Sequence, residues 1–235
     1  MLHRIFLTAL LAGALAGVSM FVAHMMMTTP LIIQAEAYET TGATHSHESN
    51  ATPESMAAHG ETSPDAHAWA PGAGLERNAY TLVADLLMSI GFAFLLVGAI
   101  ALSGQDVDLK RGLIWGLCGF AALSVGPALG LAPELPGMQS PDLQARQIWW
   151  VATALATAAG LALIFFTDPQ PLKIVAAILI VLPHLIGAPE NDVYSGELPA
   201  VLASRFAVAS LVVNGLFWLV LGGSAGYFYR RFEKL

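Results

Sequence analysis

Six long apolar segments restrict the folds that are open to this chain of 235 residues. A helix of roughly 20 apolar residues crosses a bilayer core about 30 Å thick. Charged residues make up only 11% of the chain, whereas soluble domains carry about 25%. We therefore predict an all-α integral membrane protein that forms a single membrane domain over residues 1–235. The predicted spans are residues 5–27, 80–102, 112–131, 148–166, 172–187 and 206–228.

The number of spans depends on the first and fifth segments. Residues 1–15 also fit the basic start and apolar core of a signal peptide, and cleavage near residues 17–19 would leave five spans. The apolar run continues to Met27, however, which is longer than a signal peptide needs. The fifth segment is short, so a thinned or partly broken span is expected there. We expect a bundle of about six transmembrane helices, or five if the first is removed.

The distribution of charge predicts the orientation in the membrane. If the N-terminus is cytoplasmic, seven of the ten Lys and Arg face the cytoplasm and twelve of the seventeen acids lie in outer loops. This agrees with the positive-inside rule and places both termini of a bacterial inner (cytoplasmic) membrane protein inside the cell. The net charge of -7 and the absence of a basic stripe argue against a nucleic-acid partner.

The predicted extracytoplasmic loop, residues 28–79, has an unusual composition. Between Glu36 and Glu76 it carries seven carboxylates and four histidines but no Lys or Arg. Its low-complexity part, residues 40–74, has too few large apolar residues for a core, so we predict a flexible loop. Carboxylate and imidazole bind divalent cations, which favours a cation-capturing role, although a solvated acidic linker is an alternative. The histidines are His45, His47, His59 and His67.

Three titratable residues inside the predicted spans are candidates for a metal site. Charged or titratable residues are costly in a membrane and are functional candidates by default. His24 and His184 lie near the outer ends of the first and fifth spans, and Asp85 lies about 7 to 8 Å inside the second. This common depth predicts one outer-leaflet site for an ion such as Co²⁺, Ni²⁺ or Zn²⁺. A lone histidine at an interface or an Asp85 paired with Arg77 or Arg205 is the alternative.

Glu36 and Glu39 are the first acids after the first span. They are three residues apart and would share one face if this segment is helical. We expect them to gate the ion or to relay it from the loop to the intramembrane residues. An amphipathic helix at the membrane surface with a solvated acidic face is the alternative.

Two later segments suggest a tandem hairpin repeat. The third span ends with PALGLAPE from Pro127 and the fifth with PHLIGAPE from Pro183, and Arg146 and Arg205 open the spans that follow. Internal repeats of this kind frame the substrate path in many transporters. Recurrence of helix-terminating residues is the alternative. In the last span, Asn214 is expected to hydrogen-bond a neighbouring helix.

Glycines four residues apart recur in the apolar segments. Such pairs allow two membrane helices to approach closely, although they are frequent in membrane helices generally. The pairs are Gly13 with Gly17, Gly112 with Gly116, Gly126 with Gly130, and Gly222 with Gly226.

Several segments together resemble the CbtA family of predicted cobalt transporter subunits. They are residues 30–39 (PLIIQAEAYE), 126–138 (GPALGLAPELPGM), 145–150 (ARQIWW), 182–189 (LPHLIGAP) and 205–231, near whose end stands FWLVLGGSAGYFYRR. The resemblance implies a multi-span protein, commonly of five spans, that takes up Co²⁺ for cobalamin synthesis. It also implies a small, single-span, histidine-containing partner of the CbtB type.

We therefore expect a membrane subunit for divalent metal uptake, with Co²⁺ as transported substrate, no permanent cofactor and no enzymatic activity. The outer loop would capture the ion and pass it to His24, Asp85 and His184. One alternative is a membrane redox protein whose haem is held by His24 and His184. Another is a non-transporting accessory subunit that senses metal.

Overall fold

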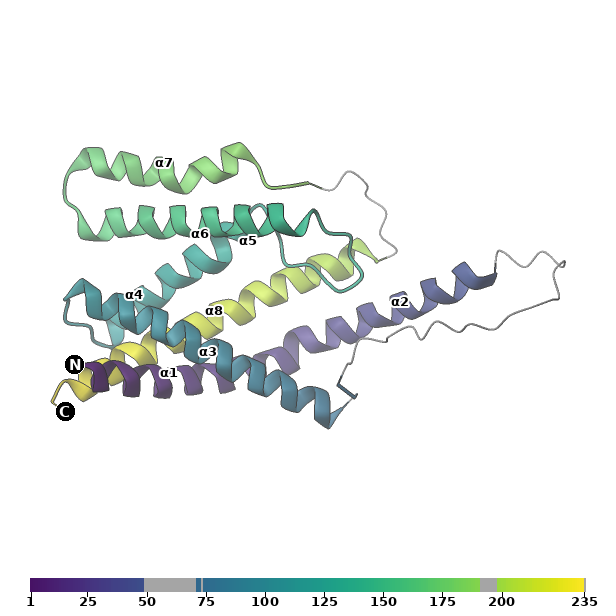
Figure 1. Ribbon diagram of the computed structural model, residues 1–235, viewed down its shortest axis with the longest axis horizontal. Helices are drawn as coiled ribbons and strands as arrows, with labels where there is room; N and C mark the ends of the chain where they lie inside the picture. The colour runs from purple at the N-terminus through teal and green to yellow at the C-terminus, as the bar shows by residue number, and fades with distance from the viewer. Residues whose placement is uncertain (49–70, 73, 191–197, 235) are drawn as a thin grey trace, which may run out of the picture.

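The computed structural model describes residues 1–48, 71–72, 74–190 and 198–234, and at residues 39–48 only the backbone. The described part of the chain is helical and contains no β-strand, which confirms the predicted all-α fold (Figure 1). The helices are α1 (Leu2–Ala23), α2 (Thr29–Glu48), α3 (Leu75–Ser103), α4 (Leu109–Phe120), α5 (Gly126–Ala128), α6 (Leu143–Phe166), α7 (Gln170–Ile186) and α8 (Ala200–Arg231). Two π-helical turns, η1 (His24–Thr28) and η2 (Ala121–Val125), and a final 3₁₀ turn, η3 (Phe232–Lys234), complete the structure.

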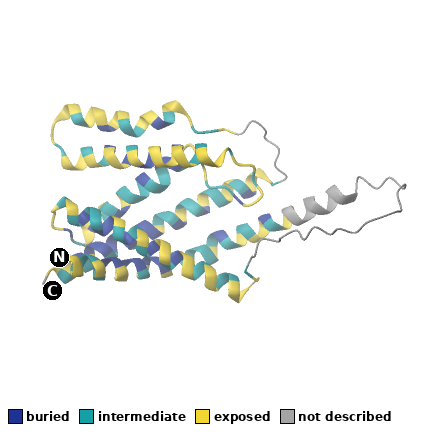
Figure 2. Cartoon of the chain, viewed as in Figure 1, coloured by how far each residue is buried: buried dark blue, intermediate teal, exposed yellow. Residues whose placement is uncertain are grey.

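Four helices of the described chain are long and apolar enough to cross a membrane. They are the continuous helix Leu2–Tyr38, then α3, α6 and α8. Helix α7 is apolar but has only 17 residues, and the third predicted span is divided among α4, η2 and α5. Many large apolar residues of these helices are exposed, and Figure 2 shows the exposed positions of α6 and α7 in yellow. The structure is that of a multi-pass membrane protein, and the count of six spans stays a prediction.

The first helix does not end where the sequence predicted. It continues from α1 through η1 into α2, which projects beyond the rest of the bundle in Figure 1. Residues 29–48 of the predicted loop are therefore helical, and residues 49–70 lie outside the described residues. The segment that carries Glu36 and Glu39 is a helix, as their proposed common face requires.

The two π-helical turns have the same backbone hydrogen bond at their end and are both followed by a proline. In each, the N–H of the residue after the turn donates to the carbonyl of the turn's first residue. A proline comes next in both cases, Pro30 after η1 and Pro127 after η2. Proline has no N–H and normally breaks or kinks a helix, whereas the wider turn changes the hydrogen-bond register just before it. This explains why the first helix passes Pro30 without ending.

Glycines set the closest helix crossings. Gly112 and Gly116 of α4 face Gly222 and Gly226 of α8, where a Cβ added at Gly116 would lie 3.0 Å from the Gly222 Cα. On the other side of the bundle, a Cβ at Gly17 of α1 would lie 2.9 Å from the Leu86 Cα of α3. Three of the predicted glycine pairs thus lie at close crossings, the third being Gly13 with Gly17.

Gly116→Ala should lower the stability of the protein in detergent. Its methyl group would press on the Gly222 backbone, and overpacking of this kind costs about 1–3 kcal/mol. Gly98→Ala in α3 is the control, because an added Cβ there meets nothing within 4 Å and alanine is the better helix former. Thermal unfolding followed by circular dichroism should separate the two variants. Equal losses would contradict the close crossing.

Both chain termini and two of the turns between helices lie at the same end of the bundle. Figure 1 shows both termini there, together with the α3–α4 and α6–α7 turns. The Arg4 Nε donates to the Tyr229 carbonyl at 2.7 Å, and its guanidinium lies 3.7 Å from the centre of the Tyr229 ring. Helices α6 and α7 form a hairpin along one side of the bundle, in which Gly160 allows α7 to approach closely at Ala176.

Candidate functional site

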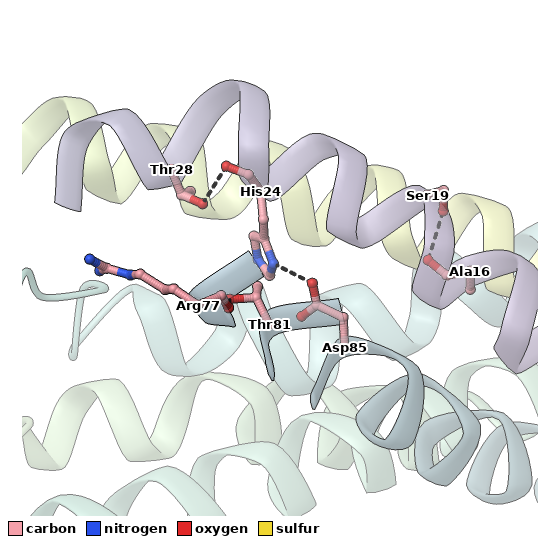
Figure 3. Close-up of polar contacts among 7 residues, drawn as sticks. All are labelled: Ala16, Ser19, His24, Thr28, Arg77, Thr81 and Asp85. Carbon is pink, nitrogen blue, oxygen red and sulfur yellow. Dashed lines mark hydrogen bonds and ion pairs between the residues drawn. The ribbon is translucent and has the colours of Figure 1, made fainter. Parts of the chain in front are cut away.

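His24 and Asp85 form a polar pair between the first two long helices. The His24 Nδ1 lies 3.0 Å from the Asp85 Oδ2, and Figure 3 shows the imidazole of η1 directed at the carboxylate of α3. Asp85 is 7% exposed, so its carboxylate is nearly buried in the protein. One turn further along α3, the fully buried Ser89 Oγ has no hydrogen-bond partner in the described chain. A second buried polar atom therefore lies one helical turn from the Asp85 position and has no hydrogen-bond partner among the described residues.

Local geometry explains why these two side chains meet. Gly17 lies seven residues before His24, and its missing side chain lets α1 approach α3 at Leu86, the residue after Asp85. The π-helical turn η1 begins at His24 itself. Such turns change the direction of the side chains that follow and are frequent at functional sites.

A second polar pair joins the same two chain segments further from the termini. The Arg77 guanidinium donates to both carboxylate oxygens of Glu36, at 2.6 Å and 3.1 Å. Arg77 precedes Asp85 by eight residues and Glu36 follows His24 by twelve, so this ion pair lies further than the first pair from the end of the bundle that holds the termini. Paired bidentate bonds of this kind are geometrically specific. Asp85 is therefore paired with His24 and not with Arg77 or Arg205, which was the alternative drawn from the sequence.

His184 does not join His24 and Asp85. It lies in α7, where its ring meets the Trp149 ring edge to face with centroids 5.9 Å apart. Helix α7 packs on α6, whereas α1 packs on α3 and α8. In the described part of the chain, no group of three or more His, Cys, Asp or Glu side chains is placed to hold a metal. The predicted three-residue site is thus reduced to a pair, because equal depth does not make two helices neighbours.

The same separation removes the support for a haem between His24 and His184. Axial ligation by two histidines requires both imidazoles on opposite sides of one iron. The helices that carry them do not pack together.

The remaining ligand candidates lie at or beyond the end of the described side chains. Glu39, His45 and His47 belong to α2, where only the backbone is described at these positions. His59 and His67 lie outside the described residues. Cation capture by the loop therefore stays a prediction.

Corresponding residues of the two copies of the predicted hairpin repeat make different contacts. Arg146 pairs with Glu134 at 3.2 Å, whereas Arg205 is exposed on α8 and forms no ion pair with the described residues. Pro127 follows η2, but Pro183 lies inside α7. The two copies therefore differ in the described residues, and Glu197, which corresponds to Glu134, lies outside them.

Asn214 makes a different contact from the one predicted. Its Nδ2 donates to the Ser210 carbonyl, four residues earlier in its own helix, at 2.9 Å. The prediction of a bond to a neighbouring helix is wrong, since a polar side chain in a helix can bond to its own backbone.

A row of buried polar atoms on α6 was not predicted from the sequence. Trp149, Thr153 and Thr157 follow one another at intervals of four, so they share one face of the helix. Each is buried, and the Trp149 Nε1 and both threonine hydroxyls have no hydrogen-bond partner in the described chain. Thr157 meets the chain at Gly126, directly after η2. The four-residue spacing in an apolar segment was the signal that could have revealed this face.

These features define a class, namely multi-pass α-helical membrane proteins with ionisable side chains buried between their helices. More specifically, the chain belongs to the CbtA family, described as "Probable cobalt transporter subunit", whose model matches residues 2–230. The match covers nearly the whole chain and confirms the resemblance seen in the sequence. A transporter subunit is not an enzyme, and its substrate is a metal ion. No curated protein and no solved structure matches the chain significantly.

Proposed function

We propose that this chain is the membrane subunit of a divalent-metal uptake system and that Co²⁺ crosses it by way of His24 and Asp85. The observation that carries this proposal is the imidazole–carboxylate pair between η1 and α3, with its nearest atoms 3.0 Å apart, a partly exposed His24 and a buried Asp85. Imidazole and carboxylate together suit a borderline divalent ion such as Co²⁺. The family supports cobalt as the substrate, which is cargo and not a permanent cofactor.

His24 and Asp85 supply two ligands, and a cobalt ion takes more. Water and the hydroxyl of Ser89, one turn from Asp85, can fill part of the remaining shell. Imidazole must be neutral to bind metal, so a proton on His24 and a metal ion compete for the same nitrogen. Weak, exchangeable coordination suits transport, because an ion that is held by a complete protein shell leaves slowly.

The outer segment, residues 28–79, which contains helix α2, would collect the ion before it reaches the pair. Seven carboxylates attract cations, and His45, His47, His59 and His67 supply neutral nitrogen ligands. Their spacing matches no rigid zinc motif, so capture would be fast and weak. The loop raises the local ion concentration, and the buried pair selects among the ions.

Deleting residues 43–67 should raise the Co²⁺ concentration needed for half-maximal uptake by about tenfold, with little change in the maximal rate. The deletion removes the loop histidines and carboxylates that hold the ion near the protein, whereas the His24–Asp85 pair remains. Uptake of radioactive cobalt by cells over a range of concentrations measures both quantities. An unchanged half-maximal concentration would refute the capture role.

Glu36 would act as the relay between loop and pair, with Glu39 on the same helix supporting it. In the structure the Glu36 carboxylate is held by Arg77. An arriving cation competes with the Arg77 guanidinium for this carboxylate, and the exchange releases α2 from the beginning of α3. The ion pair is partly exposed, so its opening costs little.

Reversing one charge of this ion pair tests the relay. Arg77→Glu places like charges together and should reduce Co²⁺ uptake about tenfold, because the guanidinium that exchanges with the arriving cation is lost. The double variant Glu36→Arg with Arg77→Glu restores opposite charges and should recover most of the uptake. Both are measured at equal amounts of protein in the membrane. Failure of the double variant to recover would show that Glu36 acts in its own position and not through the ion pair.

The family description as a subunit implies partner subunits. We propose a small, single-span, histidine-containing partner and a location in the bacterial inner membrane with cytoplasmic termini. The bases near the chain ends support this orientation, since Arg4, Lys110, Arg111 and Arg230 belong to the segments gathered at that end.

The proposed function is tested by radioactive cobalt uptake into vesicles that hold the purified chain, with and without the partner. We expect Co²⁺ to accumulate when both are present. If both together give no uptake above protein-free vesicles, a sensing or scaffolding subunit is the better description.

A further inference from the structure

A cavity of about 580 Å³ lies among α3, α4, α6 and α8, away from the His24–Asp85 pair. Its walls are mostly apolar, with Leu95, Trp115 and Phe165 among them. The titratable side chains that line it are Asp106, Arg111 and Cys118. A cavity with so few ligand atoms is unsuited to a metal ion and suited to a hydrocarbon.

The depth of the cavity matches one leaflet of a bilayer. Along α4 and η2 its lining runs from Arg111 to Leu123, which is about 18 Å of helix at 1.5 Å per residue. Half of a hydrocarbon core about 30 Å thick is slightly less than this. Helix α4 begins at the end of the bundle that holds both termini (Figure 1), and Arg111 is its third residue. The cavity therefore belongs to the leaflet on that side.

The packing of α6 explains why this space is open. Near its beginning, α6 is held closely by the chain after η2, where Trp149 meets Gly130 and Thr157 meets Gly126. Towards its end, the Phe166 ring touches the Trp115 ring of α4, with centroids 5.7 Å apart. Between these points α6 packs mainly on α7. The result is a wedge that the described side chains do not fill.

The mouth of the wedge carries one charge of each sign. The Arg111 Nη1 donates to the Asp106 backbone carbonyl, which holds the guanidinium at the mouth. The Asp106 carboxylate has no salt-bridge partner among the described residues. Gln105 adds an uncharged polar group beside them. A ligand that fits this mouth has an anion for Arg111 and a cationic hydrogen-bond donor for Asp106.

We propose that the wedge binds a zwitterionic phospholipid with a primary amine, that is, a phosphatidylethanolamine. One acyl chain lies along the apolar walls, the phosphate meets Arg111, and the ammonium group meets Asp106. A phosphatidylglycerol offers no cation to Asp106. A phosphatidylcholine offers a cation that cannot donate a hydrogen bond.

Cys118 is the probe for this proposal because it lines the cavity and is the only cysteine of the chain. The purified full chain, stripped of lipid in detergent, is treated with a maleimide, and the rate of labelling is followed by mass spectrometry. Dioleoyl phosphatidylethanolamine should slow the labelling about tenfold more than dioleoyl phosphatidylglycerol or phosphatidylcholine at equal concentration. One charge-assisted hydrogen bond accounts for a factor of about this size.

Two variants assign the headgroup contacts. Asp106→Asn should abolish the advantage of phosphatidylethanolamine over phosphatidylglycerol, and Arg111→Gln should weaken the protection by every phospholipid. Lys110→Gln is the control, since Lys110 is the exposed neighbour of Arg111 and is not part of the cavity lining. It should behave as the unchanged protein does.

Equal protection by all three lipids in the unchanged protein would overturn the proposal and leave only unselective lipid around the helices. A retained preference in Asp106→Asn would overturn it as well. Ala162→Trp gives an independent test, because its large side chain would extend from α6 into the cavity. Native mass spectrometry should then show one phosphatidylethanolamine molecule fewer than in the unchanged protein, and an unchanged number would contradict a site in this wedge.

Discussion

Replacing Asp85 by Asn should reduce Co²⁺ uptake at least about tenfold, in the range seen when a group that supports a metal ligand is lost. The amide keeps an acceptor oxygen for the His24 Nδ1 but has no charge to offset a divalent ion in a site of low dielectric constant. Because Asp85 is only 7% exposed, removing its charge relieves a desolvation cost and should not unfold the protein. Radioactive cobalt uptake at equal membrane expression measures the effect.

The matched control for this variant is Asp168→Asn. Asp168 lies in the α6–α7 turn at the opposite end of the bundle from α2. It should transport Co²⁺ like the unchanged protein. Uptake that is equally reduced in both variants would mean a general effect of lost negative charge, and full uptake by Asp85→Asn would remove the pair from the ion path.

The second large effect separates two histidines that the sequence alone could not distinguish. His24→Asn should reduce Co²⁺ uptake about as much as Asp85→Asn does, because one ligand of the same pair is lost. His184→Asn should leave uptake within about twofold of normal, since His184 lies on α7 against Trp149. Combining His24→Asn with Asp85→Asn should add little to either single change.

A strong defect in His184→Asn would contradict this assignment. It would mean that α7 reaches the α1–α3 crossing in another conformation of the protein. Amounts of each variant in the membrane are compared first, so that a loss of protein is not mistaken for a loss of transport.

Helix existence and the closest crossings were predictable from the sequence because both depend on local patterns. The apolar runs define helices by length, and glycines four apart define faces without side chains, as Gly112 and Gly116 of α4 show. The predicted depths of titratable residues rest on the constant rise of a helix. That reasoning selected His24 and Asp85, which the structure shows to be a hydrogen-bonded pair.

Which helices pack against one another could not be predicted from the sequence in the same way. His184 has a similar predicted depth, yet its helix pairs with α6 through Gly160 and Ala176. The apolar pattern of α7 does not indicate which helix packs against it. The wedge-shaped cavity beside α6 could not be predicted either, because a cavity depends on the distance between helices that are far apart in the chain.

The continuation of the first helix illustrates a third limit. Pro30 follows the apolar run, and proline commonly marks a helix end. The turn η1 absorbs it by shifting one backbone hydrogen bond, and η2 does the same before Pro127. Apolar periodicity carries no signature of such a turn, so the helix over residues 29–48 of the predicted loop was not predicted at its full length.

The most direct test of the ion path is the coordination of bound cobalt. In the variant that lacks residues 43–67, the remaining histidines are His3, His24 and His184. X-ray absorption at the cobalt edge of this protein, loaded with one equivalent of Co²⁺, should show imidazole scattering that disappears when His24→Asn is added. Imidazole scattering that persists after His24→Asn would assign the bound ion to another histidine and contradict the proposed path.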